Sequence, residues 1–197
     1  RLSTSGDKKS AFNWKLILVL AMLALCPILS VIWYWQRIIQ PRELTKLYGP
    51  ELSVSIASFE SVEGSLDAQL NPEKILSVAT KEYMTMFRET STPLTCPQCD
   101  QFWVTTSAIA TDVCVLEYSG SKRVTRATVM KTGYRVDAHT HEPVQKKVLH
   151  QDRSTYHFVN DNGTWKIMKI TDYTPEAKGQ ADLLEVLNEN WVELGCN

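Results

Sequence analysis

The sequence predicts an α+β domain in which a curved, mostly antiparallel sheet packs on helices, with one transmembrane helix before it and an amphipathic helix after it. Three observations support this fold class: a long uncharged apolar run near the N-terminus, β-rich segments from residue 102 onward, and helical apolar periodicity on both sides of those segments. Such a sheet can bury one face against helices. The 197 residues are 44% hydrophobic and 22% charged, which excludes a low-complexity chain, and the net charge of −1 disfavours a nucleic-acid partner.

Residues 16–35 are predicted to form a membrane-spanning helix. Their sequence, LILVLAMLALCPILSVIWYW, contains no charged residue, and a helix of this length spans about 30 Å, the thickness of a bilayer core. Aromatic side chains that favour the membrane interface lie at both ends, at Trp14 and at Trp33, Tyr34 and Trp35. Bulky residues at the end of the run argue against its cleavage as a signal peptide.

The orientation of the span follows from the basic residues beside it. Four precede it and three follow it: Arg1, Lys8, Lys9 and Lys15, then Arg37, Arg42 and Lys46. By the positive-inside rule, this weak excess places the N-terminus inside and the large domain on the extracytoplasmic side. The membrane would be a bacterial inner membrane, or the inner membrane of a mitochondrion or plastid, since the basic tail 1–15 also fits the remnant of a targeting segment.

Residues 36–70 are predicted to be a stalk that contains a first short strand, because apolar residues alternate with serines over residues 52–56. The α+β domain then covers residues 71–197. Its first helix begins after Asn71, which can cap it and is followed by a proline, and ends before Pro93.

Segments rich in β-branched and aromatic residues predict the strands of the domain. They cover residues 102–106, 113–118, 124–136, 144–150, 154–159 and 164–173. Turn residues at Ser119–Gly120–Ser121 and Asp161–Asn162–Gly163 predict two hairpins, so neighbouring strands should run antiparallel.

Residues 180–194 are predicted to form the C-terminal amphipathic helix. Four large apolar side chains share one stripe of it: Leu183, Leu187, Trp191 and Leu194. This stripe is a candidate interface that inserts into a partner. Packing on the chain's own sheet is an equally good interpretation of the same stripe.

The cysteines outside the span are candidates for disulfide bonds: Cys96, Cys99, Cys114 and Cys196. Cys96 and Cys99 form a CPQC pair, which could also be a redox dithiol, half of a zinc site or a pair of free thiols. The sequence has no second CxxC pair, and a structural disulfide is the favoured interpretation if the domain faces an oxidising compartment.

His139 and His141 are further candidate metal ligands, beside Cys96 and Cys99, because two histidines at this spacing would share a face of a strand. A polar loop between two strands is the favoured interpretation, since no third ligand is indicated. We therefore expect no bound metal and no other cofactor.

The closing hairpin carries a resemblance to a known family. Its sequence NDNGTWKIMKITDY contains Gly163–Thr164–Trp165–Lys166–Ile167, and residues 71–173 resemble the nuclear transport factor two-like superfamily. The resemblance implies a strongly curved antiparallel sheet that wraps around N-terminal helices to form a cone. Its membrane-anchored members, mostly non-catalytic, include assembly subunits of secretion channels, lipid-transporter accessory proteins and components of import or plastid division. Its enzymes place an Asp or His inside the cone, for which the candidates here are Asp112, Asp152, Tyr156 and Asp172.

The expected function is that of a non-catalytic single-pass membrane subunit that scaffolds or stabilises a larger membrane protein complex through its α+β domain. Its partners would be other membrane-protein subunits and the lipid bilayer. The sequence contains no recognisable catalytic constellation, so an enzyme is not expected. The alternatives are a membrane-tethered enzyme or ligand carrier that uses the cone pocket, or a dithiol protein that uses Cys96 and Cys99.

Overall fold

A computed structural model describes residues 25–90 and 100–172 of the chain. The chain divides into two units, Arg1–Gln36 and Arg37–Asn197. In the first unit, residues 25–34 are helical and the side chains of Trp33, Tyr34 and Trp35 are exposed. None of the helices within the described residues combines the length and the apolar character that a membrane crossing needs. Because residues 1–24 lie outside the description, the span over 16–35 stays a prediction.

Helical segments precede the sheet in the chain. They are the π-helical turn η1 (Trp35–Ile39), the helices α2 (Gln40–Glu63) and α3 (Leu66–Leu70), the 3₁₀ helix η2 (Pro72–Ser77) and the helix α4 (Lys81–Thr90). The predicted strand over residues 52–56 is wrong, because these residues lie inside α2. Leu52, Ile56 and Phe59 recur at helical spacing and are almost completely buried. Burial of this helical face outweighs the short alternation of apolar residues and serines.

The predicted helix after Asn71 is two helices. Asn71 does cap the first one, since its side chain accepts a hydrogen bond from the Glu73 backbone N–H at 3.2 Å. The helix then stops at Val78 because the backbone turns aside to pair with the last strand. Val78 O accepts from Ile167 N at 3.0 Å, and Thr80 N donates to Ile167 O at 2.9 Å. These two bonds replace the helical ones and separate η2 from α4.

The sheet has four antiparallel strands in the order β1-β2-β3-β4. Their bounds are β1 (Gln101–Tyr118), β2 (Lys122–Asp137), β3 (Val148–Asp161) and β4 (Thr164–Asp172). The predicted segments 102–106 and 113–118 belong to the single strand β1, which contains three shifts of register against β2. Such bulges bend a strand and increase its twist, which gives the sheet its curvature.

Both predicted hairpin turns are present. Ser119 N donates to Lys122 O at 2.8 Å and closes the β1–β2 hairpin. Asn162 and Gly163 have φ of 53° and 87° between β3 and β4, the positive values that a two-residue type I′ turn requires. The predicted strand over residues 144–150 begins later than expected, at Val148, because the preceding residues form a loop after β2.

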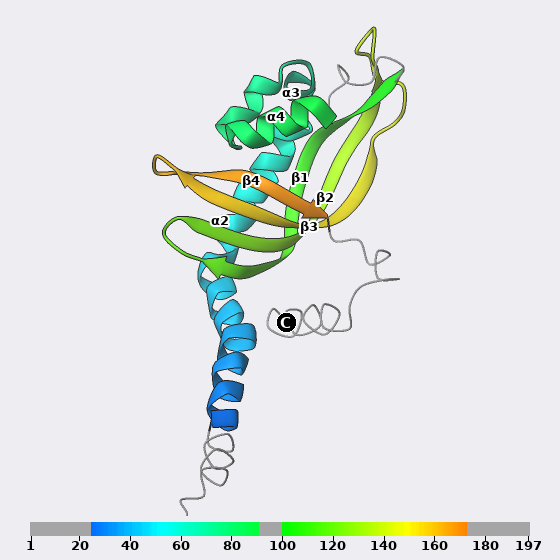
Figure 1. Cartoon of the computed structure of the whole chain (residues 1–197). Helices are drawn as coiled ribbons and strands as arrows, with labels where there is room; N and C mark the ends of the chain where they lie inside the picture. The colour runs from blue at the N-terminus through cyan, green and yellow to red at the C-terminus, as the bar shows by residue number, and fades with distance from the viewer. Residues whose placement is uncertain (1–24, 91–99, 173–197) are drawn as a thin grey trace, which may run out of the picture. The chain divides into compact units, whose positions relative to one another are not determined.

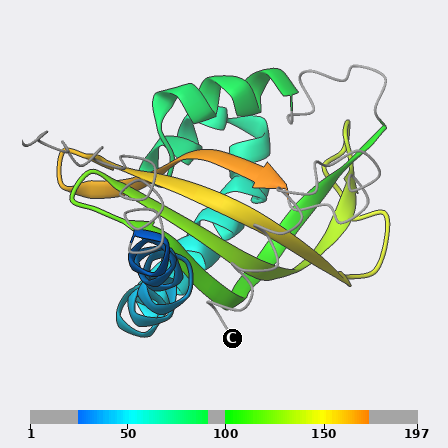
Figure 2. The same ribbon diagram turned by 60° about the horizontal axis from the view of Figure 1, so that its bottom comes forward.

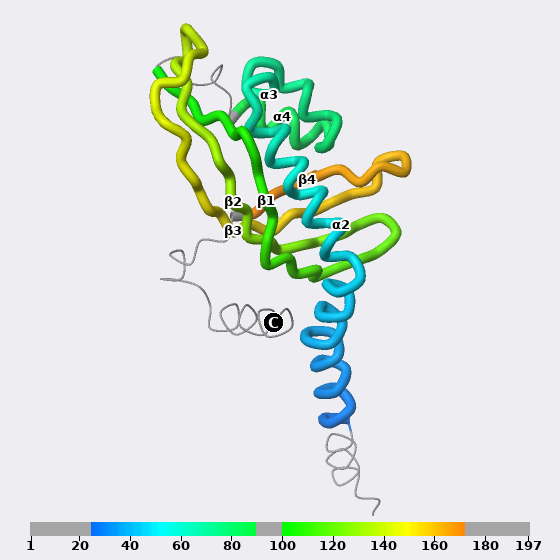
Figure 3. The backbone as a smooth tube through the Cα atoms, turned by 180° about the vertical axis from the view of Figure 1, so that it is seen from behind, coloured from blue at the N-terminus to red at the C-terminus, as the bar shows by residue number. Residues whose placement is uncertain are grey.

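The curved sheet wraps one face around the C-terminal part of α2 (Figures 1 and 2). Seen from behind, α2 lies along β1, and α3 and α4 gather over one end of the sheet (Figure 3). The core between these layers contains Leu52, Ile56, Phe59, Ile75, Tyr83, Phe87, Val115, Val129, Tyr156, Phe158 and Ile167. The predicted α+β arrangement of a curved antiparallel sheet on helices is therefore confirmed. The predicted C-terminal helix over 180–194 lies outside the described residues.

Candidate functional site

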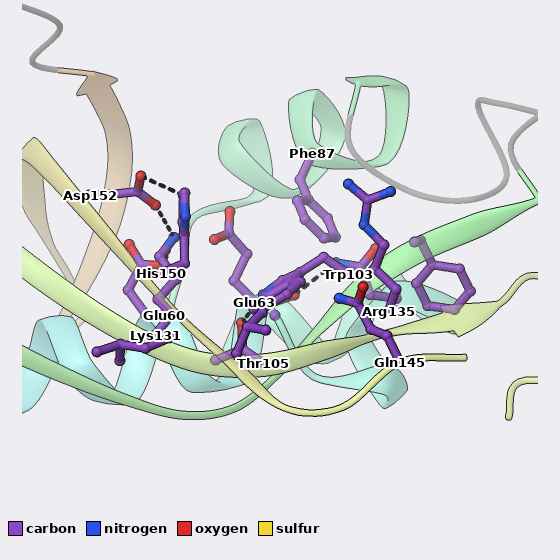
Figure 4. A pocket seen from close by; sticks show the side chains of 15 residues that line it. Glu60, Glu63, Phe87, Trp103, Thr105, Lys131, Arg135, Gln145, His150 and Asp152 are labelled. Carbon is purple, nitrogen blue, oxygen red and sulfur yellow. Dashed lines mark hydrogen bonds and ion pairs between the residues drawn. The ribbon is translucent and has the colours of Figure 1, made fainter. Parts of the chain in front are cut away.

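A cavity of about 670 Å³ opens between the end of α2 and the concave face of the sheet (Figure 4). Alternation along β2 explains why Lys131 and Arg135, four residues apart, both face it. On β3, Val148 and His150 also line it, and His150 lies directly opposite Lys131. The remaining lining residues are Glu60, Glu63, Gly64, Gln69, Phe87, Phe102, Trp103, Thr105, Gln145, Leu149 and Asp152.

One side of the cavity holds a chain of paired charges. The Lys131 Nζ atom lies 2.8 Å from Glu60 Oε2 and 3.2 Å from Asp152 Oδ2. Tyr156 Oη donates to the other Glu60 oxygen at 2.5 Å, and His150 Nε2 lies 2.9 Å from Asp152 Oδ1. The Glu60 side chain is 4% exposed, so its carboxylate depends on Lys131 and Tyr156 to replace water.

The protonation states of this cluster follow from burial and from its neighbours. Burial favours the neutral form of Lys131, but the carboxylates of Glu60 and Asp152 outweigh it, and the pKa of Lys131 is raised above its ordinary value. Burial, reinforced by the charge of Glu60, raises the pKa of Tyr156 well above its ordinary value. At neutral pH Lys131 is therefore an ammonium and Tyr156 a neutral hydrogen-bond donor.

The other side of the cavity is formed by aromatic side chains and a second cation. Trp103 and Arg135 are cross-strand neighbours on β1 and β2, and Phe87 reaches the cavity from α4. Figure 4 shows Arg135 beside Phe87 on this side, away from Asp152, His150 and Lys131. Between the two sides, Glu63 accepts a short hydrogen bond from Tyr83 Oη.

A second surface feature, which we call the α2–β1 groove, lies elsewhere on the domain. It encloses about 420 Å³ and is lined by Ser53, Val54, Ala57, Ser58, Ser61, Ala108, Ile109 and Ala110. Val54 and Ile109 are 69% and 58% exposed, and Leu47, two helical turns before Val54, is 70% exposed. The groove therefore presents large apolar side chains beside small ones that let a partner backbone approach closely.

The two predicted histidine ligands lie in the loop after β2. The Asp137 carboxylate accepts hydrogen bonds from the backbone N–H groups of His139 and Thr140, both at 2.8 Å, and these bonds lower the pKa of Asp137. His141 has a φ of 58° in the same turn. Within residues 25–90 and 100–172, no group of three or more His, Cys, Asp or Glu side chains is arranged to hold a metal ion.

The predicted cysteine chemistry falls mostly outside the described residues. Cys114 lies in β1, is 4% exposed and is not a free cysteine, whereas Cys26 is free and exposed. Cys96, Cys99 and Cys196 lie outside the description, as do the candidate interface residues Leu183, Leu187, Trp191 and Leu194. The cysteine pairing and the C-terminal interface thus stay predictions.

Sequence reasoning named part of the cavity and missed the rest. Of the four residues proposed to lie inside the cone, Asp152 lines the cavity. Tyr156 donates a hydrogen bond to Glu60, which also lines it. Asp112 lies instead in a bulge of β1 with a φ of 48°, and Asp172 ends β4 opposite Ser154. Glu60 was missed, although a carboxylate four residues after Ile56 on the apolar face of a helix is a signal of a buried ion pair.

Comparison with known proteins gives likenesses of fold. No family model matches the chain, and no curated protein matches it. Among solved structures, it resembles the intermembrane space region of the chloroplast protein ARC6, with 12% identity and a TM-score of 0.43, over 68% of this chain and 96% of that one. It also resembles an NTF2-like protein involved in plasmid conjugation, with 11% identity and a TM-score of 0.44, over 68% of this chain and 52% of that one. The curved sheet around α2 is the arrangement that the nuclear transport factor two-like resemblance implied, and the likeness concerns the fold alone.

Proposed function

We propose that the chain is a non-catalytic, single-pass membrane subunit that holds or stabilises neighbouring subunits of a larger membrane protein complex. Residues 16–35 would anchor it with the N-terminus inside and the domain on the extracytoplasmic side. On that side, disulfide bonds among Cys96, Cys99, Cys114 and Cys196 would be stable. The partners would be membrane proteins whose own segments reach the domain.

The α2–β1 groove is the observation that carries this proposal. Single exposed apolar residues are common on protein surfaces, but Leu47, Val54 and Ile109 accompany a groove of small side chains. A groove of this kind fits an apolar helix face of a neighbouring membrane protein, as in helix-in-groove contacts. Its helix α2 begins only five residues after the predicted span, so the groove lies close in sequence to the predicted membrane anchor.

A second candidate function is an enzyme or ligand carrier that uses the cavity. His150, whose Nε2 lies 2.9 Å from Asp152 Oδ1, favours it, because a histidine oriented by a carboxylate is a common general base. Against a catalytic role stands the commitment of Asp152 to Lys131 and of Glu60 to Lys131 and Tyr156. Both carboxylates are thus already engaged by side chains of the protein itself.

The test is purification of the full, affinity-tagged chain from its native membranes in a mild detergent. We expect the chain in the membrane fraction and a stoichiometric set of membrane proteins with it. A Val54→Lys/Ile109→Lys variant should keep its thermal stability, since both positions are exposed, and lose those proteins. Met168→Lys, at an apolar position of β4 that is 41% exposed, is the control and should retain them.

Three results would contradict the proposal: a chain that purifies alone, a chain found in the soluble fraction, or a groove variant that keeps all its partners. Turnover of a substrate that is lost in His150→Gln, with the groove variant unaffected, would support the second candidate instead.

A further inference from the structure

We propose that the cavity beside α2 is a binding site for a small organic anion, a ligand with a flat apolar body and one carboxylate or similar oxyanion. The cavity and the α2–β1 groove share no lining residue. Ligand binding therefore does not rest on the membrane complex, and the failure of one proposal leaves the other standing.

The first part of the site is a platform made by the Trp103 indole. A Cβ atom on Gly133 would lie 2.6 Å from the Trp103 ring and 2.2 Å from the backbone oxygen of Val104. The ring therefore lies against the bare backbone of β2, in space that any side chain at position 133 would fill. Its Nε1 donates to Thr105 Oγ1 at 3.2 Å, which fixes the orientation of the ring.

A second glycine holds this platform in place. The Gly64 carbonyl at the end of α2 accepts a hydrogen bond from Thr105 N at 2.7 Å. A Cβ atom on Gly64 would lie 2.2 Å from Thr105 Oγ1, the same oxygen that accepts the hydrogen bond from Trp103 Nε1. The approach of α2 to β1, and with it the position of the indole, thus depends on the absence of a side chain here. The position of the indole is consequently fixed by the close packing of α2, β1 and β2 around it.

The charge of the ligand follows from the cations around the cavity. Lys131 is committed to two carboxylates, Glu60 and Asp152. Arg135, the cross-strand neighbour of Trp103, has no hydrogen bond or ion pair from its side chain to any residue that the structure describes. Its guanidinium is planar and can bind a carboxylate through two parallel hydrogen bonds. The charge still available in the cavity is therefore positive.

The carboxylates of the cavity do not favour a cationic ligand instead. Glu60 and Asp152 share Lys131, Asp152 also binds His150, and Glu63 accepts from Tyr83. A bound cation would have to displace these partners. The apolar body of an anion, in contrast, finds a surface on the indole face and on Phe87, Phe102 and Val148. A volume of about 670 Å³ lies within the range of small-molecule sites.

The experiment measures binding of 1-naphthaleneacetate to the full chain in a mild detergent by calorimetry. Its neutral amide, 1-naphthaleneacetamide, has nearly the same shape and corrects for partition into micelles. We expect the acid to bind at least tenfold more tightly than the amide. Arg135→Gln should weaken the acid about tenfold or more and leave the amide unchanged. Lys147→Gln removes an exposed cation that does not line the cavity and should change neither affinity by more than about twofold.

Arg135 is exposed, so its variant is expected to fold, and an unchanged melting temperature checks this. Equal affinity for acid and amide would overturn the proposal, as would an Arg135→Gln variant that binds the acid like the wild type. Absence of binding by either ligand at millimolar concentration would also overturn it. Competition of the acid by free benzoate, with none by benzyl alcohol, would further support a site for an organic anion.

Discussion

Two cations of β2, Arg123 and Lys131, lie in contrasting surroundings although they share one face of the strand. Their spacing of eight residues places both toward α2, and each forms an ion pair with a glutamate of that helix. Arg123 Nη1 lies 2.7 Å from Glu51 Oε1, and Lys131 Nζ lies 2.8 Å from Glu60 Oε2. The same contact between helix and strand is therefore made twice, at the two ends of the domain.

The surroundings of Arg123 are aromatic. Its guanidinium lies 4.4 Å from the centre of the Tyr118 ring and 3.8 Å from that of Trp165. Tyr48 of α2 stacks on the Tyr118 ring, with the two ring centres 3.6 Å apart. The Arg123 side chain is 7% exposed, whereas that of Glu51 is 54% exposed. This end is a closed stack in which the ring contacts, more than the ion pair, stabilise the cation.

At the Lys131 end, the burial of the two ion-pair partners is reversed. There the glutamate is the buried partner, at 4% exposure, and the lysine binds a second carboxylate, Asp152. An ammonium is a compact charge that can bridge two carboxylates, whereas a planar guanidinium stacks between rings. The comparison teaches that one strand face can close the core at one end and leave a charged cavity at the other, according to the type of cation placed there.

The largest expected effect on stability follows from removing the Lys131 ammonium. Lys131→Met leaves the buried Glu60 carboxylate with Tyr156 alone, and should lower the free energy of unfolding by about 3 kcal/mol, as for broken buried ion pairs. Denaturation in urea, followed by tryptophan fluorescence, measures it. The double variant Glu60→Gln/Lys131→Met should recover more than half of the loss. A single variant as stable as the wild type would show that the pair contributes nothing.

A smaller effect is expected at the aromatic end. Arg123→Lys keeps the positive charge but loses the planar contact with two rings and the hydrogen bond that Arg123 Nη2 donates to Tyr118 Oη at 2.7 Å, at a cost of about 1–2 kcal/mol. The same urea titration measures this change, with Glu51→Gln as the control. Because Glu51 is half exposed, that control should cost less than Arg123→Lys. The reverse order would mean that the ion pair, and not the stack, stabilises Arg123.

The smallest effect concerns pH and lies at the aromatic end, where His157 pairs with Val124 on β2. Burial, with the charges of Lys122 and Lys169, lowers the pKa of His157 below its ordinary value of 6.5, while Glu117 opposes the shift. The unfolded chain therefore binds this proton more readily than the folded one. The contribution of neutral His157 to the free energy of unfolding is therefore present above about pH 6.5. It is lost as the pH falls through the lower pKa of the folded state.

Melting temperatures of the wild type and of His157→Gln between pH 7.5 and pH 5.5 test this direction. We expect the wild type to lose slightly more stability on acidification than the variant. Identical profiles would show that the histidine titrates alike in the folded and unfolded chain.

Much of the sheet was predictable because its signals are local. Asn162 and Gly163 supply the positive φ values of a hairpin turn by their own chemistry, whatever the rest of the chain does. The β-branched run of β2 predicts a strand within a few residues of its observed bounds. Asn71 likewise caps a helix through a bond to a residue two positions away.

Other features depended on contacts between distant segments. Residues 52–56 alternate like a strand, yet form part of α2 because Leu52, Ile56 and Phe59 meet the concave sheet. The helix after Asn71 is interrupted because β4 pairs with the backbone of Val78 and Thr80. No local pattern contains these partners, and for that reason the sequence wrongly predicted a strand over residues 52–56 and a single continuous helix after Asn71.

By itself, the sequence determined the α+β class, the antiparallel hairpins and their turns, since each depends on a few adjacent residues. Only the tertiary structure decided that α2 enters the curved sheet and that Glu60 meets Lys131 and Asp152 there. The physical reason is that a buried charge is tolerated only where a partner replaces water, and that partner comes from a remote strand. The cavity exists because the fold, and no motif, brings these side chains together, among them Arg135, whose guanidinium has no ion-pair partner within the described residues.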